Sequence, residues 1–241
     1  MRVNMADYFF TYGSYVPVEY QWSLFGTGHI LWMLLILAAG ILLIKKLAGR
    51  RLEIALGIYL IGWTILRICW LSFIGSMSIY ELPLHLCSLA AFFCFIYVWK
   101  KWDFLGQALY ALCLPGTVLA LIFPDWTMYP IVSMGSIEGF TYHAGVLYFI
   151  CLELALGNIR PQFRSTWKVC LFTAVLTLVI YCFDRAVSAN YMFLLSPPAG
   201  SPLELMENLL GRSGYLIGYA VAAFAVVLII ESTGTVLTDS F

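Results

Sequence analysis

Charged residues are scarce in this sequence. Only 11% of its 241 residues are Asp, Glu, Lys or Arg, whereas soluble domains carry roughly 25%. Hydrophobic residues make up 62% and the mean hydropathy is +0.90. This composition excludes a soluble domain with a single anchor, and the 13 basic and 13 acidic residues leave no net charge that would favour nucleic acid. The chain is predicted to be an all-α, polytopic membrane protein.

Several motifs are also missing. The seven cysteines lie inside or at the ends of apolar runs, and none forms a C-x-x-C pair, which argues against a disulfide framework or a structural zinc site. There is no Gly-rich phosphate loop, and residues 1–23 have no basic n-region of a signal peptide. Those residues are rich in aromatics and are predicted to lie at the membrane interface. We expect one membrane domain over 1–241, with no metal, no cofactor and no evident protein partner.

Long apolar runs are abundant. Seven of them are long enough to cross about 30 Å of hydrocarbon as helices. They predict a seven-helix bundle with these spans: 24–44, 54–74, 82–99, 104–123, 140–157, 167–184 and 214–231.

The loops between these runs alternate in basic content. The loops 75–81, 124–139 and 185–213 hold only Arg185 and Arg212. The other loops hold most of the basic residues, namely Lys45, Lys46, Arg50, Arg51, Lys100, Lys101, Arg160, Arg164 and Lys168. The positive-inside rule then places the N-terminus outside and the C-terminus in the cytoplasm. The short loops and tails favour a bacterial plasma membrane.

The segment 81–88 (ELPLHLCS) gathers a carboxylate, an imidazole, a thiol and a hydroxyl where a polar loop meets an apolar run. Ionisable groups in a membrane helix are costly and indicate function. Cys87 is the candidate nucleophile, because a thiolate there could attack an acyl carbonyl. The other six cysteines are interpreted as packing residues.

The base for Cys87 must come from another segment if the helix is regular. His85 would lie about 200° around the helix from Cys87, and it would share a face with Glu81 instead. His143, near the outer end of the fifth run, has a matching depth and completes a Cys/His dyad. His29, near the outer end of the first run, is a second candidate base.

Arg67 is a lone arginine in the outer half of the second run and needs a partner. Glu81, Glu138 or Asp184 could form a structural ion pair with it. Alternatively, its guanidinium could bind a lipid phosphate. The outer loop that holds Asn190 could cover the site as a lid.

The segment 82–88 (LPLHLCS), the seven runs and the loop 190–194 (NYMFL) resemble the YwaF-like bacterial integral membrane proteins and their eukaryotic relative, transmembrane protein 164. The resemblance covers nearly the whole chain, although residues 196–198 (SPP) replace a basic residue before a single proline. It implies a cysteine acyltransferase that moves a fatty acyl chain from a phospholipid to a lysophospholipid, notably an ether lysolipid. Its nucleophile matches Cys87, and its histidine on a later span best matches His143.

The expected mechanism is a thioester on Cys87 with His143 as base, in the outer half of the membrane. Its phospholipid and lysophospholipid substrates need further contacts. The candidate oxyanion or orienting residues are His85, Glu81, Tyr142 and Asn190, besides backbone N–H groups near Pro83, and the candidate substrate-binding residues are Arg67, Glu138 and Tyr191.

Two alternatives remain open. A lipid hydrolase would use the same residues with water as the acceptor. A non-enzymatic receptor or carrier would use Arg67, Glu81 and Glu138 as an ion pathway. The charged residues cluster at one end and the inner halves of most runs are bare, which disfavours a path through the membrane but not an outer ligand pocket.

Overall fold

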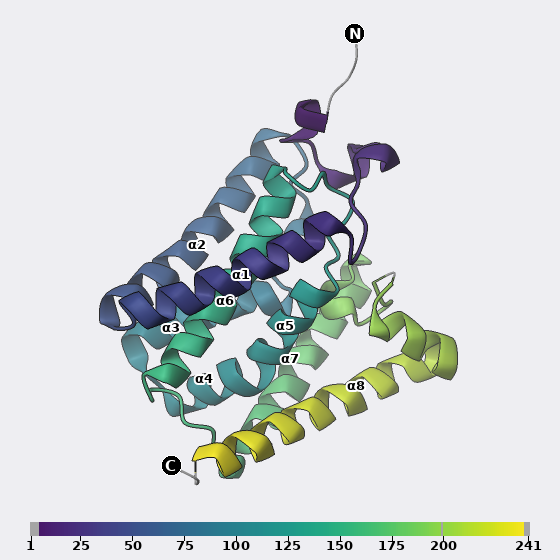
Figure 1. Ribbon diagram of the computed structural model, residues 1–241. Helices are drawn as coiled ribbons and strands as arrows, with labels where there is room; N and C mark the ends of the chain where they lie inside the picture. Colours follow the sequence, from purple (N-terminus) through teal and green to yellow (C-terminus); the bar gives the residue numbers. More distant parts are fainter. Residues whose placement is uncertain (1–4, 199, 239–241) are drawn as a thin grey trace.

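The computed structural model describes residues 5–198 and 200–238, and this part of the chain contains only helices, turns and loops, without a strand (Figure 1). A π-helical turn, η5 (Leu109–Cys113), joins α4 to α5, so these two form one continuous helix. The α-helices are α1 (Thr27–Leu47), α2 (Arg50–Phe73), α3 (Leu86–Lys100), α4 (Asp103–Ala108), α5 (Leu114–Ile122), α6 (Met134–Ala155), α7 (Thr166–Val187) and α8 (Pro202–Thr238). The short 3-10 helices are η1 (Met5–Tyr8), η2 (Gly13–Tyr15), η3 (Val18–Tyr20), η4 (Ile79–Glu81), η6 (Phe163–Ser165) and η7 (Tyr191–Phe193).

Each predicted apolar run coincides with a helix, and the protein is an integral membrane protein. Five helical stretches have both the length and the apolar composition of a membrane span. The apolar α3 has only 15 residues, and α6 is not among these five stretches. The five stretches are Thr27–Leu47, Arg50–Phe73, Asp103–Ile122, Phe163–Val187 and Pro202–Thr233.

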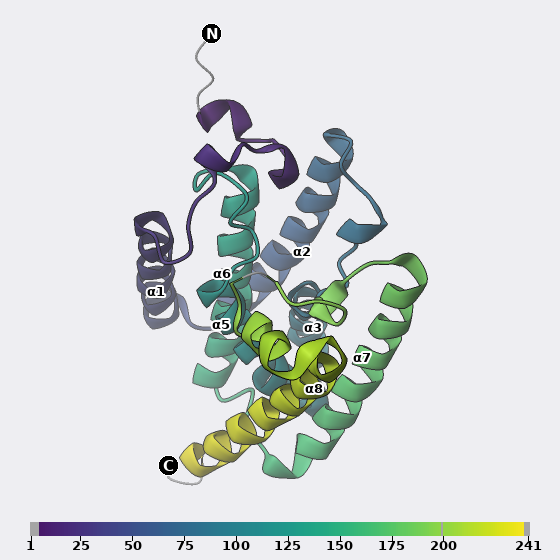
Figure 2. The same ribbon diagram turned by 90° about the vertical axis from the view of Figure 1, so that its right-hand side faces the viewer.

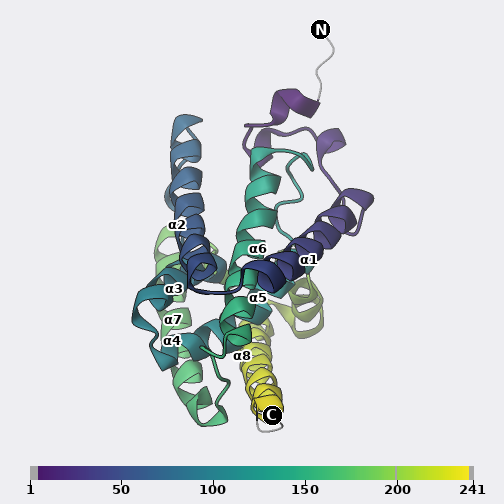
Figure 3. The same cartoon turned by 60° about the vertical axis from the view of Figure 1, so that its left-hand side comes forward.

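Helix α6 is the centre of the bundle. It packs against α1, α2, α3 and α5, which surround it in Figures 1 and 3. Its side chains Tyr142, His143 and Glu153 are buried. Because its neighbours shield it, α6 can carry polar residues that a lipid-facing helix could not.

Helix α1 stands at the periphery, apart from α7 and α8 on the other side of α6 (Figure 2). Gly40 allows its close approach to α6, since a Cβ there would lie 2.5 Å from the Tyr148 ring. The Tyr148 hydroxyl donates a hydrogen bond of 2.5 Å to the carbonyl of Ile36. These contacts fix α1 on the central helix.

The aromatic N-terminal segment caps one end of the bundle (Figure 1). The Trp70 indole donates to the carbonyl of Phe10 at 3.1 Å, and the N–H of Met134 donates to the carbonyl of Phe9 at 2.9 Å. The segment thus ties α2 to α6 at the end where the candidate catalytic residues lie.

Two helices are irregular where the sequence contains proline or glycine. The π-helical η5 ends two residues before Pro115, which removes a backbone donor from the helix. Gly211 has φ 69° and ψ 168° inside α8, so the helix bends sharply there (Figure 2). Residues 202–210, predicted to be loop, form the first arm of this bent helix.

The opposite end of the bundle holds a second polar network, which the sequence analysis did not single out. Lys101 Nζ lies 2.7 Å from Glu53 Oε1 and 2.5 Å from Glu153 Oε2. Both carboxylates are buried, with 2% and 0% of their side chains exposed. Arg50 adds a 2.6 Å contact to Glu53. Sequence spacing could not reveal this network, since its members come from α2, α6 and the end of α3.

Candidate active site

The segment that holds Cys87 changes from extended chain to helix at His85. His85 has φ −66° and ψ 151°, and α3 begins at the next residue. Pro83 restricts Leu82 to extended conformations, and Leu82 has φ −64° and ψ 149° at the end of η4. The helix therefore begins at 86 and not at 82, which makes Cys87 its second residue.

This start changes the geometry expected for His85. The angle of about 200° between His85 and Cys87 applied to a continuous helix, but His85 precedes the helix and both residues line one cavity. Glu81 lies in η4 and pairs with Arg67. The predicted Glu81–His85 contact is therefore replaced, because His85 bonds to Met192 instead.

Cys87 occupies the first turn of α3 and is half-buried. The first N–H groups of an α-helix have no partner within the helix, and their partial positive charge offsets part of the cost of burying a thiolate. The Ser88 hydroxyl and N–H lie next to the thiol. The Tyr142 hydroxyl donates to the carbonyls of Cys87 at 3.3 Å and Ser88 at 3.4 Å. These bonds place the Tyr142–His143 turn of α6 beside the nucleophile.

The hydrogen bonding of His85 defines its tautomer. The N–H of Met192 donates to His85 Nδ1 at 3.2 Å, so a neutral His85 carries its proton on Nε2. The ring packs between Tyr191 and Phe193, with centroid distances of 5.1 and 5.3 Å. Burial lowers the pKa of His85, which favours this neutral form.

The loop after α7 holds His85 in place. Asn190 organises the loop, because its side-chain oxygen accepts from the N–H groups of Leu195 and Ser196 and its amide donates to Ser196. The Tyr191 hydroxyl accepts from the N–H of Leu82 at 2.8 Å and donates to the carbonyl of Ile79 at 2.6 Å. Asn190 and Tyr191 are thus occupied by protein partners.

Met192 and Phe193 in the same loop have left-handed backbones, with φ of 52° and 57°. Side chains rarely adopt this conformation and it costs about 1–3 kcal/mol. The Tyr215 hydroxyl donates to the carbonyl of Phe193 at 2.6 Å, which anchors the strained turn to α8. The turn presents the Met192 N–H to His85.

His143 has the opposite tautomer. Its Nδ1 lies 2.6 Å from the carbonyl of Gly139, so Nδ1 must be the donor and Nε2 has a free lone pair in the neutral form. The ring stacks on Trp126 with centroids 4.8 Å apart and an interplanar angle of 19°. His143 is 7% exposed. No direct hydrogen bond joins it to Cys87 among residues 5–198 and 200–238.

His29 cannot act as a base in this structure. Its Nδ1 accepts from the N–H of Phe25 at 3.1 Å, and its Nε2 lies 2.9 Å from the carbonyl of Leu121. Both ring nitrogens are therefore occupied. The candidate base that remains on a later helix is His143.

Two of the three carboxylates that were predicted as partners of Arg67 form ion pairs with it. Arg67 forms an ion pair with Glu81 and a second one with Glu138 at 3.5 Å, while Asp184 is buried on α7 and makes no ion pair with it in the described structure. Tyr12 from the N-terminal segment also donates to Glu81. We call Tyr12, Arg67, Glu81 and Glu138 the Arg67 cluster.

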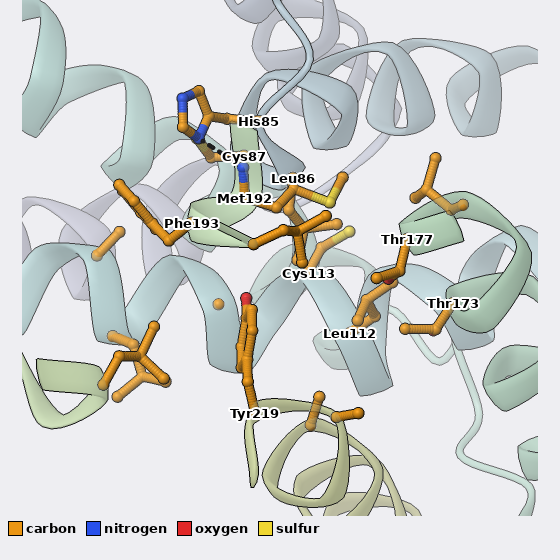
Figure 4. Close-up of a pocket in the computed structure, with 18 of the residues that line it drawn as sticks. His85, Leu86, Cys87, Leu112, Cys113, Thr173, Thr177, Met192, Phe193 and Tyr219 are labelled. Atoms are coloured by element: carbon orange, nitrogen blue, oxygen red, sulfur yellow. Dashed lines mark hydrogen bonds between the residues drawn. The ribbon is translucent and has the colours of Figure 1, made fainter. Parts of the chain in front are cut away.

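A cavity of about 640 Å³ extends from His85 and Cys87 between α5, α7 and α8 (Figure 4). This size is typical of ligand-binding pockets, which range over about 300–1,000 Å³. His143 does not belong to its wall. The wall is mostly apolar and includes Leu112, Gly116, Leu119, Ala120, Phe123, Ala174, Leu176, Leu178, Leu216, Ala220, Ala223 and Phe224.

Several residues near the site escaped the sequence analysis. Trp126 stacks on His143, Tyr12 joins the Arg67 cluster, and Met192 supplies a backbone donor. Thr117 lines the cavity and its hydroxyl has no hydrogen-bond partner, although it is only 1% exposed. An aromatic ring or a threonine in a membrane protein is too common to single out, and a backbone donor leaves no trace in a sequence.

No cluster of three or more His, Cys, Asp or Glu side chains suited to a metal ion occurs within residues 5–198 and 200–238. Among curated proteins none matches this chain, and no solved structure matches it. The sequence profile of the TMEM164 family matches residues 24–231, which include α1 to α7 and most of α8. The chain therefore belongs to the TMEM164 family.

Proposed function

We propose that this protein is a membrane acyltransferase that moves a fatty acyl chain from a phospholipid to a lysophospholipid through a thioester on Cys87. The observation that carries the proposal is the position of Cys87, in the first turn of α3 and at the wall of the 640 Å³ apolar cavity. The partial positive charge at the helix end lowers the cost of forming a thiolate in these apolar surroundings, and the cavity is suited to an acyl chain. The combination of a cysteine at a helix N-terminus with an acyl-sized apolar cavity is what favours acyl transfer.

The two histidines take different roles because their tautomers differ. His143 Nε2 has a free lone pair and can accept the Cys87 proton as a general base. His85 Nε2 carries a proton and can donate to an oxyanion. A bridging water or a small side-chain rotation brings His143 within reach, since catalytic hydrogen bonds often tighten only with substrate.

The reaction has two steps. The Cys87 thiolate attacks the ester carbonyl carbon, the resulting oxyanion collapses, and the lysolipid alcohol leaves with the proton that His143 had accepted. The hydroxyl of an acceptor lysolipid then attacks the thioester, with His143 again as base. Backbone N–H groups of the first turn of α3 and the His85 Nε2–H stabilise the oxyanion in both steps. The Tyr142 and Asn190 side chains bond to the protein backbone instead, and they hold the segments around Cys87 and His85 in place.

The Arg67 cluster holds the segment before Cys87 in place. Glu81 precedes that segment, and its carboxylate is bonded to α2 through Arg67 and to the N-terminal segment through Tyr12. Glu138 extends the cluster to α6. Because the Arg67 guanidinium already contacts two carboxylates, we assign this cluster a positioning role, with lipid headgroups contacting its accessible edge.

The alternation of basic loops supports an outside N-terminus, a cytoplasmic C-terminus and a site in the outer half of a bacterial plasma membrane. Transfer is favoured over hydrolysis because the wall of the cavity is mostly apolar, which keeps water from the thioester. A lysolipid acceptor can reach the same cavity from the membrane.

The test is intact-protein mass spectrometry of the detergent-purified protein mixed with a diacyl phospholipid. Wild type should gain an acyl mass that hydroxylamine removes, Cys87→Ala should gain none, and His143→Ala should gain it at least about 100-fold more slowly. Added lysophospholipid should discharge the adduct faster than water does. Discharge by water alone would assign a hydrolase. Absence of any adduct, with lysolipid binding unchanged in Cys87→Ala, would assign a ligand-binding protein.

A further inference from the structure

Tyr219 stands out in the cavity as a polar group from the wall opposite Cys87. Figure 4 shows its hydroxyl pointing from α8 into the cavity, toward the side where His85, Cys87 and Met192 lie. The hydroxyl has no hydrogen-bond partner in the described part of the chain. A hydroxyl in apolar surroundings without a partner costs roughly 1–3 kcal/mol, so this position favours a ligand with an acceptor oxygen.

Three other tyrosines around the site have hydroxyl groups that are occupied by protein partners. The Tyr191 hydroxyl bonds to Ile79 and Leu82, the Tyr215 hydroxyl bonds to Phe193, and the Tyr110 hydroxyl donates to the carbonyl of Ile230. These bonds fix the backbone, whereas the Tyr219 hydroxyl fixes none.

The orientation of Tyr219 is coupled to the rest of the site. Its ring stacks on Tyr215 with centroids 6.0 Å apart and an interplanar angle of 23°. Tyr215 is anchored to Phe193, and Phe193 packs against the His85 ring. A continuous set of contacts therefore connects the hydroxyl on α8 with the histidine beside Cys87.

We propose that Tyr219 is a catalytic residue whose hydroxyl donates a hydrogen bond to the carbonyl oxygen of the acyl group that reacts with Cys87. This inference rests on the proposed acyl transfer. The ester oxygen would lie between two walls, with His85 and the α3 N-terminus on one side and Tyr219 on the other.

The bond changes define the role of the hydroxyl. When the thiolate forms the S–C bond, the π electrons of the carbonyl move to its oxygen, and the Tyr219 hydroxyl donates to that oxyanion without losing its proton. Collapse restores the carbonyl and breaks the C–O bond to the lysolipid, whose oxygen takes the proton from His143. Tyr219 ends the step unchanged and serves the deacylation in the same way.

The substitution Tyr219→Phe tests this role, because it removes the oxygen and keeps the ring that stacks on Tyr215. The measurement is the rate of acyl-adduct formation against the concentration of a diacyl phospholipid in detergent micelles. The maximal rate should fall about 100-fold, the typical effect of removing one oxyanion donor, while the half-saturating lipid concentration changes less than about threefold. Tyr181→Phe is the matched control, since Tyr181 lines the same cavity from α7, and it should retain a near wild-type rate.

The outcomes separate the two proposals. An adduct that forms on Tyr219→Phe at the wild-type rate would overturn the role of Tyr219 and leave the acyl transfer intact. A loss confined to the half-saturating concentration, or an equal loss in Tyr181→Phe, would also overturn it, since either result indicates lipid binding or packing. Absence of an adduct on wild type would overturn the proposed function itself. Thermal unfolding and binding of a non-cleavable diether phospholipid verify that Tyr219→Phe is folded.

Discussion

Each histidine at the site has one ring nitrogen committed to the backbone, and the partner decides what the other nitrogen can do. His85 accepts from the N–H of Met192, so the substitution His85→Ala leaves that buried donor unpaired. We expect a loss of about 1–3 kcal/mol in the free energy of unfolding. His85→Asn should recover most of it, since its side-chain oxygen can take the place of Nδ1. Thermal unfolding in detergent measures both, and an equal loss in the two variants would contradict the role of Nδ1.

The same burial makes stability depend on pH. Burial lowers the pKa of His85 in the folded protein, whereas the unfolded chain titrates near 6.5. Below about pH 6.5 the unfolded chain therefore binds more protons than the folded one, and the free energy of unfolding falls as the pH drops. We expect His85→Asn to lose less stability than wild type between pH 7 and the folded pKa of His85. Parallel pH curves for the two proteins would refute this origin of the acid sensitivity.

At the scale of elements, the loop after α7 connects three parts of the site. Tyr191→Phe removes the hydroxyl that bonds to both Leu82 and Ile79, which should cost about 1–3 kcal/mol in stability. It should also slow acyl-adduct formation, because the loop positions His85. The control is Tyr80→Phe, whose ring is exposed. If proteolysis shows the loop equally protected in Tyr191→Phe and wild type, the hydroxyl does not hold the segment.

Helix α8 limits the width of the cavity through small residues such as Ala223. We expect Ala223→Phe to fill part of the 640 Å³ and shift the adducts formed from a mixture of donor lipids toward shorter acyl chains. Val221→Phe, on the exposed side of α8, should leave the chain distribution unchanged. The masses of the adducts give the result directly, and an unchanged distribution in Ala223→Phe would mean that the chain lies elsewhere.

The sequence predicted the helices well and the geometry between them less well. Hydrophobic runs located each helix because lipid demands a continuous apolar stretch. Pro83 hid the true start of α3, so the angular argument for His85 and Cys87 failed. The first arm of α8 was predicted to be loop because Glu204 and Glu207 interrupt its apolar residues. Periodicity carries no information on the contact between Met192 and His85, because a backbone donor is the same in every residue.

At the scale of the whole molecule, two polar clusters lie at opposite ends of α2 and α6. The Arg67 cluster joins α2, α6 and the segment before α3. At the other end, Lys101 bridges Glu53 of α2 and Glu153 of α6. The central pair of helices is therefore fixed at both ends by charge, which keeps α6 and its His143 in register with α3.

This arrangement predicts an unequal response of two neighbouring lysines. Lys101→Met leaves two buried carboxylates without their shared cation and should lower the free energy of unfolding by about 3 kcal/mol, whereas Lys100→Met at an exposed site should change it by less than about 0.5 kcal/mol. Adding Glu153→Gln to Lys101→Met should restore part of the loss, because it removes the buried charge that Lys101 compensated, whereas Glu53 keeps its contact with Arg50. Unfolding in mixed detergent micelles measures all three variants. Similar stabilities for Lys101→Met and Lys100→Met would show that the ends of α2 and α6 are held by packing alone.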